Sequence, residues 1–120
     1  MFREELKQLV ESCDGGAGAV LMGFDGIAVE THAVEAAAPD TDVNTVGMEL
    51  SFVLGQVRKA VEALQLGALA EVTVVAERLT VIMRVLTTDY FVALALLPGG
   101  NLGKGRYLLR VAAPRLQKEL

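Results

Sequence analysis

Cysteine and histidine are almost absent from this chain of 120 residues, which contains one of each, Cys13 and His32. A single cysteine excludes a disulfide bond within the chain and fits a reducing compartment. Protein metal sites usually gather several Cys or His ligands, so we predict no metal site. Nucleophilic catalysis lacks support too, because neither residue has a chemical companion and the only serines, Ser12 and Ser51, fall in predicted helices. The sequence therefore predicts no catalytic residue, no cofactor and no enzymatic activity.

Long hydrophobic runs are also missing, although 52% of the residues are hydrophobic. No stretch reaches the roughly 18 apolar residues that a membrane-spanning helix requires. The N-terminal sequence Met-Phe-Arg-Glu-Glu has no basic region followed by an apolar run, so no signal peptide is expected. We predict a cytoplasmic protein that does not insert into membranes, with residues 1–120 forming one domain.

Basic residues are outnumbered, eleven against fifteen acidic ones, which argues against a general nucleic-acid-binding protein. The two signs are unevenly distributed, since residues 1–50 contain ten acidic residues but only two basic ones. The C-terminal segment carries the opposite bias, with Lys104, Arg106, Arg110, Arg115 and Lys118 and no acidic residue among them. These side chains form either a solvated helix face or a patch for a phosphate group or an acidic partner.

What the sequence does contain is a clear succession of periodic segments. The predicted order is a helix (2–13), two strands (17–23 and 27–32), a helix (42–65), three strands (69–76, 79–86 and 90–97) and a helix that begins after Asn101. Asp25-Gly26 predicts a tight hairpin turn, because glycine accepts positive φ. Asp40-Thr41-Asp42 is expected to cap the central helix rather than to bind a metal. Pro114 is expected to kink or end the last helix near Ala113.

The last predicted strand, Tyr-Phe-Val-Ala-Leu-Ala-Leu-Leu, does not alternate with polar residues. A strand that is apolar on both sides needs a layer on both faces of its sheet. We therefore predict an α+β fold of order α-β-β-α-β-β-β-α. Its five-stranded antiparallel sheet has the central helix on one face and the terminal helices on the other.

The central helix is the most informative segment, because it has two apolar sides. Residues at alternating steps of three and four are predicted to face the core: Val43, Val46, Leu50, Val53, Val57, Ala60 and Leu64. Met48, Phe52, Gly55 and Ala63 fall on roughly the opposite side, where a surface helix is normally polar. Another surface is needed to cover them. The rival interpretation is that Met48 and Phe52 are merely scattered exposed apolar residues.

Residues 99–105, Gly-Gly-Asn-Leu-Gly-Lys-Gly, imitate a phosphate-binding loop. Such a loop needs a glycine at the position of Pro98 and a hydroxyl group at the position of Gly105, and neither is present. We predict that the chain does not bind nucleotide by itself. Gly103 and Gly105 are instead expected to let the last helix approach the sheet closely.

Taken with particular residues, this order of elements resembles the Roadblock family, which is related to a dynein light chain. The residues that carry the resemblance are the first hairpin, Gly-Ala-Val-Leu-Met-Gly-Phe-Asp-Gly-Ile-Ala-Val at 18–29, and Asn101-Leu102-Gly103 with Arg106 at the start of the last helix. The resemblance covers essentially the whole chain. It points to the bacterial MglB-like branch of GTPase regulators, or to a paralogue of that branch.

The resemblance implies a homodimer in which central helices pack together and the strands after them pair into one continuous sheet. Met48, Phe52 and Ala63 would then meet their counterparts, and Gly55 would allow the helices to approach. Val72 and Val74 belong to the pairing strand, which has no proline and would invite aggregation if left unpaired.

The resemblance also implies a function, a non-catalytic dimeric regulator in a Ras-like small-GTPase module, in bacterial polarity or gliding motility. The candidate partner-binding residues are Glu49, Gln56, Arg58, Lys59 and Glu62. The alternative is a scaffold or adaptor that binds another Roadblock protein without touching the GTPase. The end of the sequence at Lys118-Glu119-Leu120 favours this alternative, because MglB-like regulators continue beyond the last helix. A third hypothesis, an enzyme that uses Cys13 or His32, ranks last.

Overall fold

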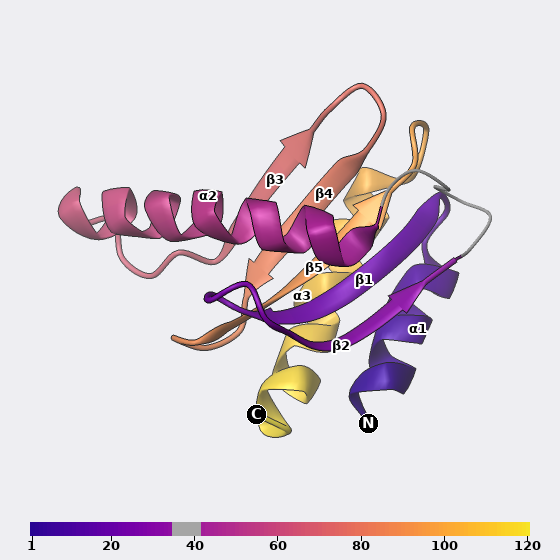
Figure 1. The fold of residues 1–120 in the computed structure, drawn as a ribbon, viewed down its shortest axis with the longest axis horizontal. Coiled ribbons are helices and arrows are strands. Elements are labelled where there is room, and N and C mark those ends of the chain that lie inside the picture. Colours follow the sequence, from indigo (N-terminus) through magenta and orange to yellow (C-terminus); the bar gives the residue numbers. More distant parts are fainter. Residues whose placement is uncertain (35–41) are drawn as a thin grey trace.

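A computed structural model of the protein describes residues 1–34 and 42–120. The described elements are α1 (Phe2–Ser12), β1 (Gly16–Gly23), β2 (Ala28–Ala33), α2 (Val43–Ala63), β3 (Glu71–Val75), β4 (Thr80–Val85), β5 (Tyr90–Leu96) and α3 (Leu102–Lys118). This is the predicted order, and α3 is the element whose end differs most from the prediction (Figure 1). Within the described part of the chain, no helix is long and apolar enough to cross a bilayer.

The five strands form one antiparallel sheet in the order β2-β1-β5-β4-β3, which confirms the predicted fold class. The apolar strand β5 lies in the centre, between β1 and β4. Its side chains alternate between the two faces, so that Val92 and Leu94 join one buried cluster while Phe91 and Ala93 join the other. Strand β5 can therefore be apolar on both sides, because helices cover both faces of the sheet.

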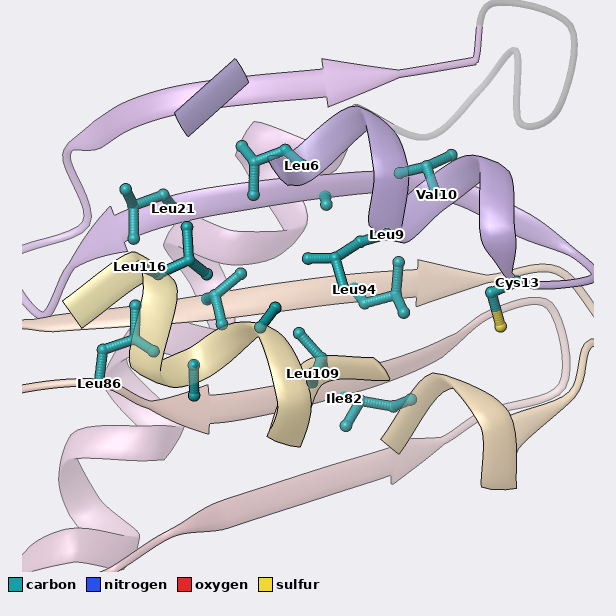
Figure 2. Close-up of a cluster of buried hydrophobic side chains, with 14 of the residues drawn as sticks. Leu6, Leu9, Val10, Cys13, Leu21, Ile82, Leu86, Leu94, Leu109 and Leu116 are labelled. Atoms are coloured by element: carbon teal, nitrogen blue, oxygen red, sulfur yellow. The ribbon is translucent and has the colours of Figure 1, made fainter. Parts of the chain in front are cut away.

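Helices α1 and α3 cover one face of the sheet together. Leu6, Leu9, Leu109 and Leu116 project from them into the first buried cluster, opposite side chains of β1, β4 and β5 (Figure 2). Cys13 is part of the same cluster and packs there as a small core residue. Each of these four leucines is at most 4% exposed, so the sides of α1 and α3 that face the sheet are buried within the single chain.

Helix α2 is the one described helix on the other face (Figure 1). Its first half lies close to β1, and the absence of a side chain at Gly47 permits this. A Cβ atom there would lie only 3.1 Å from side-chain atoms of Val20 and Met22. Asp42 caps the helix as predicted, since its carboxylate accepts a hydrogen bond from the backbone N–H of Asn44 at 3.0 Å. Asp40 and Thr41, the other predicted capping residues, lie outside the described residues.

The predicted core stripe of α2 is wrong in part. The buried residues of α2 are Val43, Gly47, Ser51 and Leu54, with Val46, Leu50 and Val57 half-buried beside them. Val53, Ala60 and Leu64 were assigned to the core by their spacing, yet all three are exposed. The reason is that glycine and serine occupy two of the positions nearest the sheet, so hydrophobicity alone placed the buried stripe at the wrong angle.

Helix α3 also differs from the prediction, because it continues through Pro114 to Lys118. Proline in a helix interior forfeits a backbone hydrogen bond and costs about 3 kcal/mol. The turn after Pro114 has compensating contacts: Leu116 is fully buried, and the Gln117 amide donates a hydrogen bond to the Leu86 carbonyl at 2.7 Å. Packing of the last turn therefore keeps the helix intact beyond the proline.

The two glycines at the start of α3 have different environments. A Cβ atom on Gly105 would lie 2.8 Å from Cδ1 of Ile82, so Gly105 permits the close approach that was predicted. Gly103 is exposed, and the nearest atom to a Cβ there is the Asn101 side-chain oxygen at 3.8 Å. The prediction for Gly103 is therefore wrong.

This difference predicts opposite effects of one substitution. Gly105→Leu should lower the free energy of unfolding by about 1–3 kcal/mol, because the added atoms overpack the cluster around Ile82. Gly103→Leu should leave stability unchanged or raise it by up to about 1 kcal/mol through helix propensity. Urea denaturation of both variants measures this, and equal destabilisation would contradict the assignment.

Candidate protein interaction site

The outer face of α2 carries an apolar surface that the other described residues leave uncovered. Phe52 is 69% exposed and Met48 is 43% exposed, and Ala63 is exposed with them. Val53 and Leu64, which their spacing had assigned to the core, are exposed as well and lie on the flank of this surface. Covering one such large side chain would contribute roughly 1.5–3 kcal/mol. We call these five residues the outer apolar face.

The second half of α2 projects past the edge of the sheet (Figure 1). Beneath it lies an open hollow of about 770 Å³, bounded by the helix, by residues 67–70 and by the turn after β4. Phe52 and Gly55 line this hollow from the helix side. A Cβ atom on Gly55 would meet nothing within 4 Å, so glycine is not required there by the fold of the single chain.

Strand β3 is an edge strand, as predicted, because β4 is the one described strand with which it pairs. Its other edge presents backbone N–H and C=O groups without a neighbouring strand in the described part of the chain. Val72 and Val74 are half-buried and pack against the cluster beneath α2, whereas Val75 is 68% exposed. The two predicted interface valines thus lie on the same face of the sheet as α2.

The polar candidates on α2 divide into two groups. Glu49, Gln56, Lys59 and Glu62 are exposed, and we call these four residues the binding rim. Gln56, Lys59 and Glu62 line the hollow together with Phe52, whereas Glu49 does not. The hollow therefore combines an apolar wall with charges of both signs, which suits a protein surface better than a small ligand.

Arg58 differs from these four because the fold already uses it. Its guanidinium group lies 3.6 Å from the centre of the Phe24 ring and donates a hydrogen bond to the Thr88 carbonyl at 2.8 Å. Phe24 in turn packs edge-on against Phe91, with ring centres 5.4 Å apart. The side chain is half-buried rather than exposed, so it ties α2 to the turns at one end of the sheet.

This role predicts that Arg58→Ala lowers the free energy of unfolding by about 1–3 kcal/mol, through loss of a charged hydrogen bond and a cation–π contact. Lys59→Ala, on the next residue, is the matched control and should change stability by less than about 0.5 kcal/mol. Thermal and urea unfolding measure both. If the two variants are equally stable, Arg58 belongs to the binding rim instead.

The residues considered for catalysis have no chemical setting for it. Cys13 is buried, and its thiol donates a weak hydrogen bond to the Asn101 carbonyl at 3.4 Å. Burial, and secondly the charge of Asp14, raise the pKa of the Cys13 thiol, with an opposing effect of Lys104. The reactive thiolate form is therefore disfavoured. His32 lies on β2, paired with Ala19, and among the described residues no group of three His, Cys, Asp or Glu side chains could hold a metal ion.

The glycine-rich residues 99–105 are arranged as a helix start. The Asn101 side chain accepts a hydrogen bond from the Lys104 amide at 3.0 Å and so occupies one of the free N–H groups of α3. The segment therefore caps the helix with its own side chain.

Comparisons with solved structures agree with this architecture. The chain is 42% identical to MglC from Myxococcus xanthus over 99% of this chain and 98% of that one, with a TM-score of 0.72. A Roadblock/LC7 domain from Streptomyces avermitilis shares the fold at 14% identity, with a TM-score of 0.82 over 97% of this chain and 94% of that one. The gliding protein MglB from Thermus thermophilus does so at 16% identity, with a TM-score of 0.83 over 96% of this chain and 84% of that one. No protein-family model and no curated protein matches the chain.

Proposed function

The chain belongs to the Roadblock family, and on this premise we propose that it is a dimeric, non-catalytic regulator in a Ras-like small-GTPase module. It acts through protein–protein contacts, in bacterial polarity or gliding motility. The similar proteins support this context, because one is MglC and another is the gliding protein MglB. The observation that carries the proposal is the outer apolar face of α2 beside the unpaired edge of β3.

A second copy of the chain suits both features together. Phe52, Met48 and Ala63 would pack against their counterparts across a two-fold axis, and Gly55, which the single chain does not need, would allow the helices to approach. The β3 edges would pair, which removes a strand edge that is prone to aggregation. Val72 and Val74 would contribute through the paired strand and its support beneath α2.

Replacing Met48 by Glu together with Phe52 by Arg should therefore convert the dimer to a monomer. Each large apolar side chain contributes roughly 1.5–3 kcal/mol when buried, and each substitution acts twice in a symmetric dimer. Light scattering coupled to size-exclusion chromatography measures the mass, and circular dichroism checks that the chain is folded. An unchanged dimer mass would rule out this interface.

Gln8→Arg together with Ser12→Glu is the matched control, because it introduces the same two charges at exposed positions of α1, on the opposite side of the sheet. This variant should keep the dimer mass. If the Met48 and Phe52 double variant is insoluble, Phe52→Ser alone should raise the dimer dissociation constant measurably. Failure of Phe52→Ser to do so would also contradict the proposal.

A second candidate function is an adaptor that binds another Roadblock protein without contacting the GTPase. The observation that favours it is the difference between the two identities, 42% to MglC but 16% to MglB. At 16% identity only the fold is shared, so a binding surface of MglB is not carried over to this chain. The binding rim of Glu49, Gln56, Lys59 and Glu62 would then contact a related Roadblock chain.

Purified proteins distinguish the two functions. A regulator should accelerate GTP hydrolysis by the Ras-like GTPase of the same cell, or co-elute with it in a nucleotide-dependent manner. An adaptor should capture another Roadblock protein and leave hydrolysis unchanged. In either case Gln56→Ala with Lys59→Glu should weaken the interaction by about tenfold or more. Light scattering on this variant shows whether the dimer persists, because both residues lie on the same stripe of α2 as Phe52 and Ala63. Unaltered binding by this variant would place the partner elsewhere on the molecule.

A further inference from the structure

Helix α3 presents a second surface that the proposed dimer does not use. Tyr107, Val111, Pro114 and Lys118 follow one another at steps of four and three, so they form a ridge along the side of α3 that faces away from the sheet. Tyr107 is 54% exposed and Val111 is 40% exposed. We call this line of four residues the α3 ridge.

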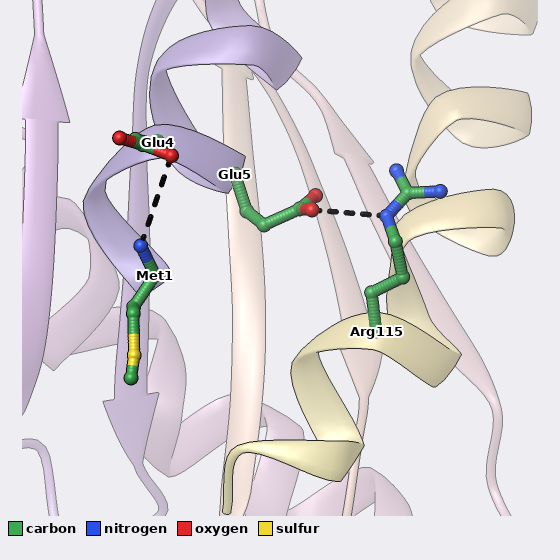
Figure 3. Close-up of polar contacts among 4 residues, drawn as sticks. All are labelled: Met1, Glu4, Glu5 and Arg115. Carbon is green, nitrogen blue, oxygen red and sulfur yellow. Dashed lines mark hydrogen bonds and ion pairs between the residues drawn. The ribbon is translucent and has the colours of Figure 1, made fainter.

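The fold neutralises two of the five basic side chains of α3. Arg115 pairs with Glu5 of α1 at 3.0 Å, a contact that joins the two helices in Figure 3. Arg106 pairs with Glu71 of β3 at 2.7 Å. Both pairs connect α3 to a neighbouring element, so these two arginines serve the fold itself.

The other three basic residues, Lys104, Arg110 and Lys118, have no acidic partner among the described residues. Lys104 and Arg110 flank the α3 ridge on opposite sides, and Lys118 ends it. The Arg110 guanidinium group lies 5.6 Å from the centre of the Tyr107 ring, which keeps a positive charge beside the exposed aromatic side chain. The surface thus combines an apolar line with three positive charges that no ion pair of the described residues engages.

We propose that this surface is a docking site for an acidic, amphipathic peptide segment of a partner protein. The apolar side of the segment covers Tyr107 and Val111, and its carboxylates meet Lys104, Arg110 and Lys118. The distance from Lys104 to Lys118 is about 21 Å along the helix, which about 15 helical residues match. The site is independent of the proposed function, because α3 and α2 lie on opposite faces of the sheet.

The number of free cations and the shape of the surface favour a peptide over a nucleic acid or an anionic membrane. Affinity for a nucleic acid comes mainly from the phosphates that Lys and Arg neutralise, and three free cations provide few such contacts. A flat anionic membrane would also meet the exposed Glu4 and Glu11 of α1, which packs beside α3. A narrow peptide that follows the α3 ridge avoids these carboxylates.

The test uses a fluorescein-labelled helical peptide of about 15 residues with glutamates flanking a leucine stripe. Fluorescence anisotropy measures its binding to the full chain and to two variants with equal net charge. Lys104→Glu with Arg110→Glu should bind about tenfold or more weakly. Lys7→Glu with Arg78→Glu, at exposed positions on α1 and in the turn before β4, should bind as the unmodified chain does.

The variant at Lys104 and Arg110 is expected to fold, because a glutamate in the first turn of a helix favours the helix dipole. Tyr107→Ser should weaken binding as well, and a peptide with the same residues in scrambled order should bind less tightly than the designed one. Rising salt should weaken the interaction.

Several results would overturn the proposal. These are no measurable binding at about 1 mM protein, equal loss in both charge variants, or no loss in the variant at Lys104 and Arg110. Equally tight binding of a short DNA duplex, or of vesicles with phosphatidylcholine and phosphatidylserine in equal parts, would also overturn it. A failed dimer test on α2 variants has no bearing on these outcomes.

Discussion

The whole structure depends on a sheet that must be covered on both faces, because its central strand β5 is apolar on both. Helices α1 and α3 cover one face completely, with leucines of both helices buried in one cluster. Among the residues that the structure describes, α2 is the one helix that covers the other face. It packs on the sheet through Val43, Gly47, Ser51 and Leu54, and its second half projects past β3 (Figure 1). The unequal layers leave α2 with an outer apolar face and β3 with a free edge.

The order of elements was predictable because each segment carries its own periodicity or turn chemistry. Asp42 and Asp25-Gly26 are local signals, and the apolar sequence of β5 by itself implied a layer on each face of the sheet. The side of α2 that faces the sheet was not predictable, since Gly47 and Ser51 occupy buried positions that hydrophobicity does not mark. The end of α3 escaped prediction for a different reason: contacts of Leu116 and Gln117 with residues distant in sequence hold the helix together beyond Pro114.

The candidate site was likewise predictable from the sequence only in part. Met48 and Phe52 were identifiable because exposed apolar residues break the pattern of a surface helix. Their extension by Val53 and Leu64 required the true orientation of α2. The function of Arg58 as a tie to Phe24 and Thr88 depends on contacts between segments some thirty residues apart. The α3 ridge became apparent only when ion pairs separated the engaged arginines from the free cations.

The central claim is that a second copy of the chain covers α2 and β3. Sedimentation equilibrium of the unmodified protein tests it most directly. The account predicts a mass of twice the 12.8 kDa of one chain, maintained at low micromolar concentration. A mass of one chain at every concentration, with the protein folded, would contradict it.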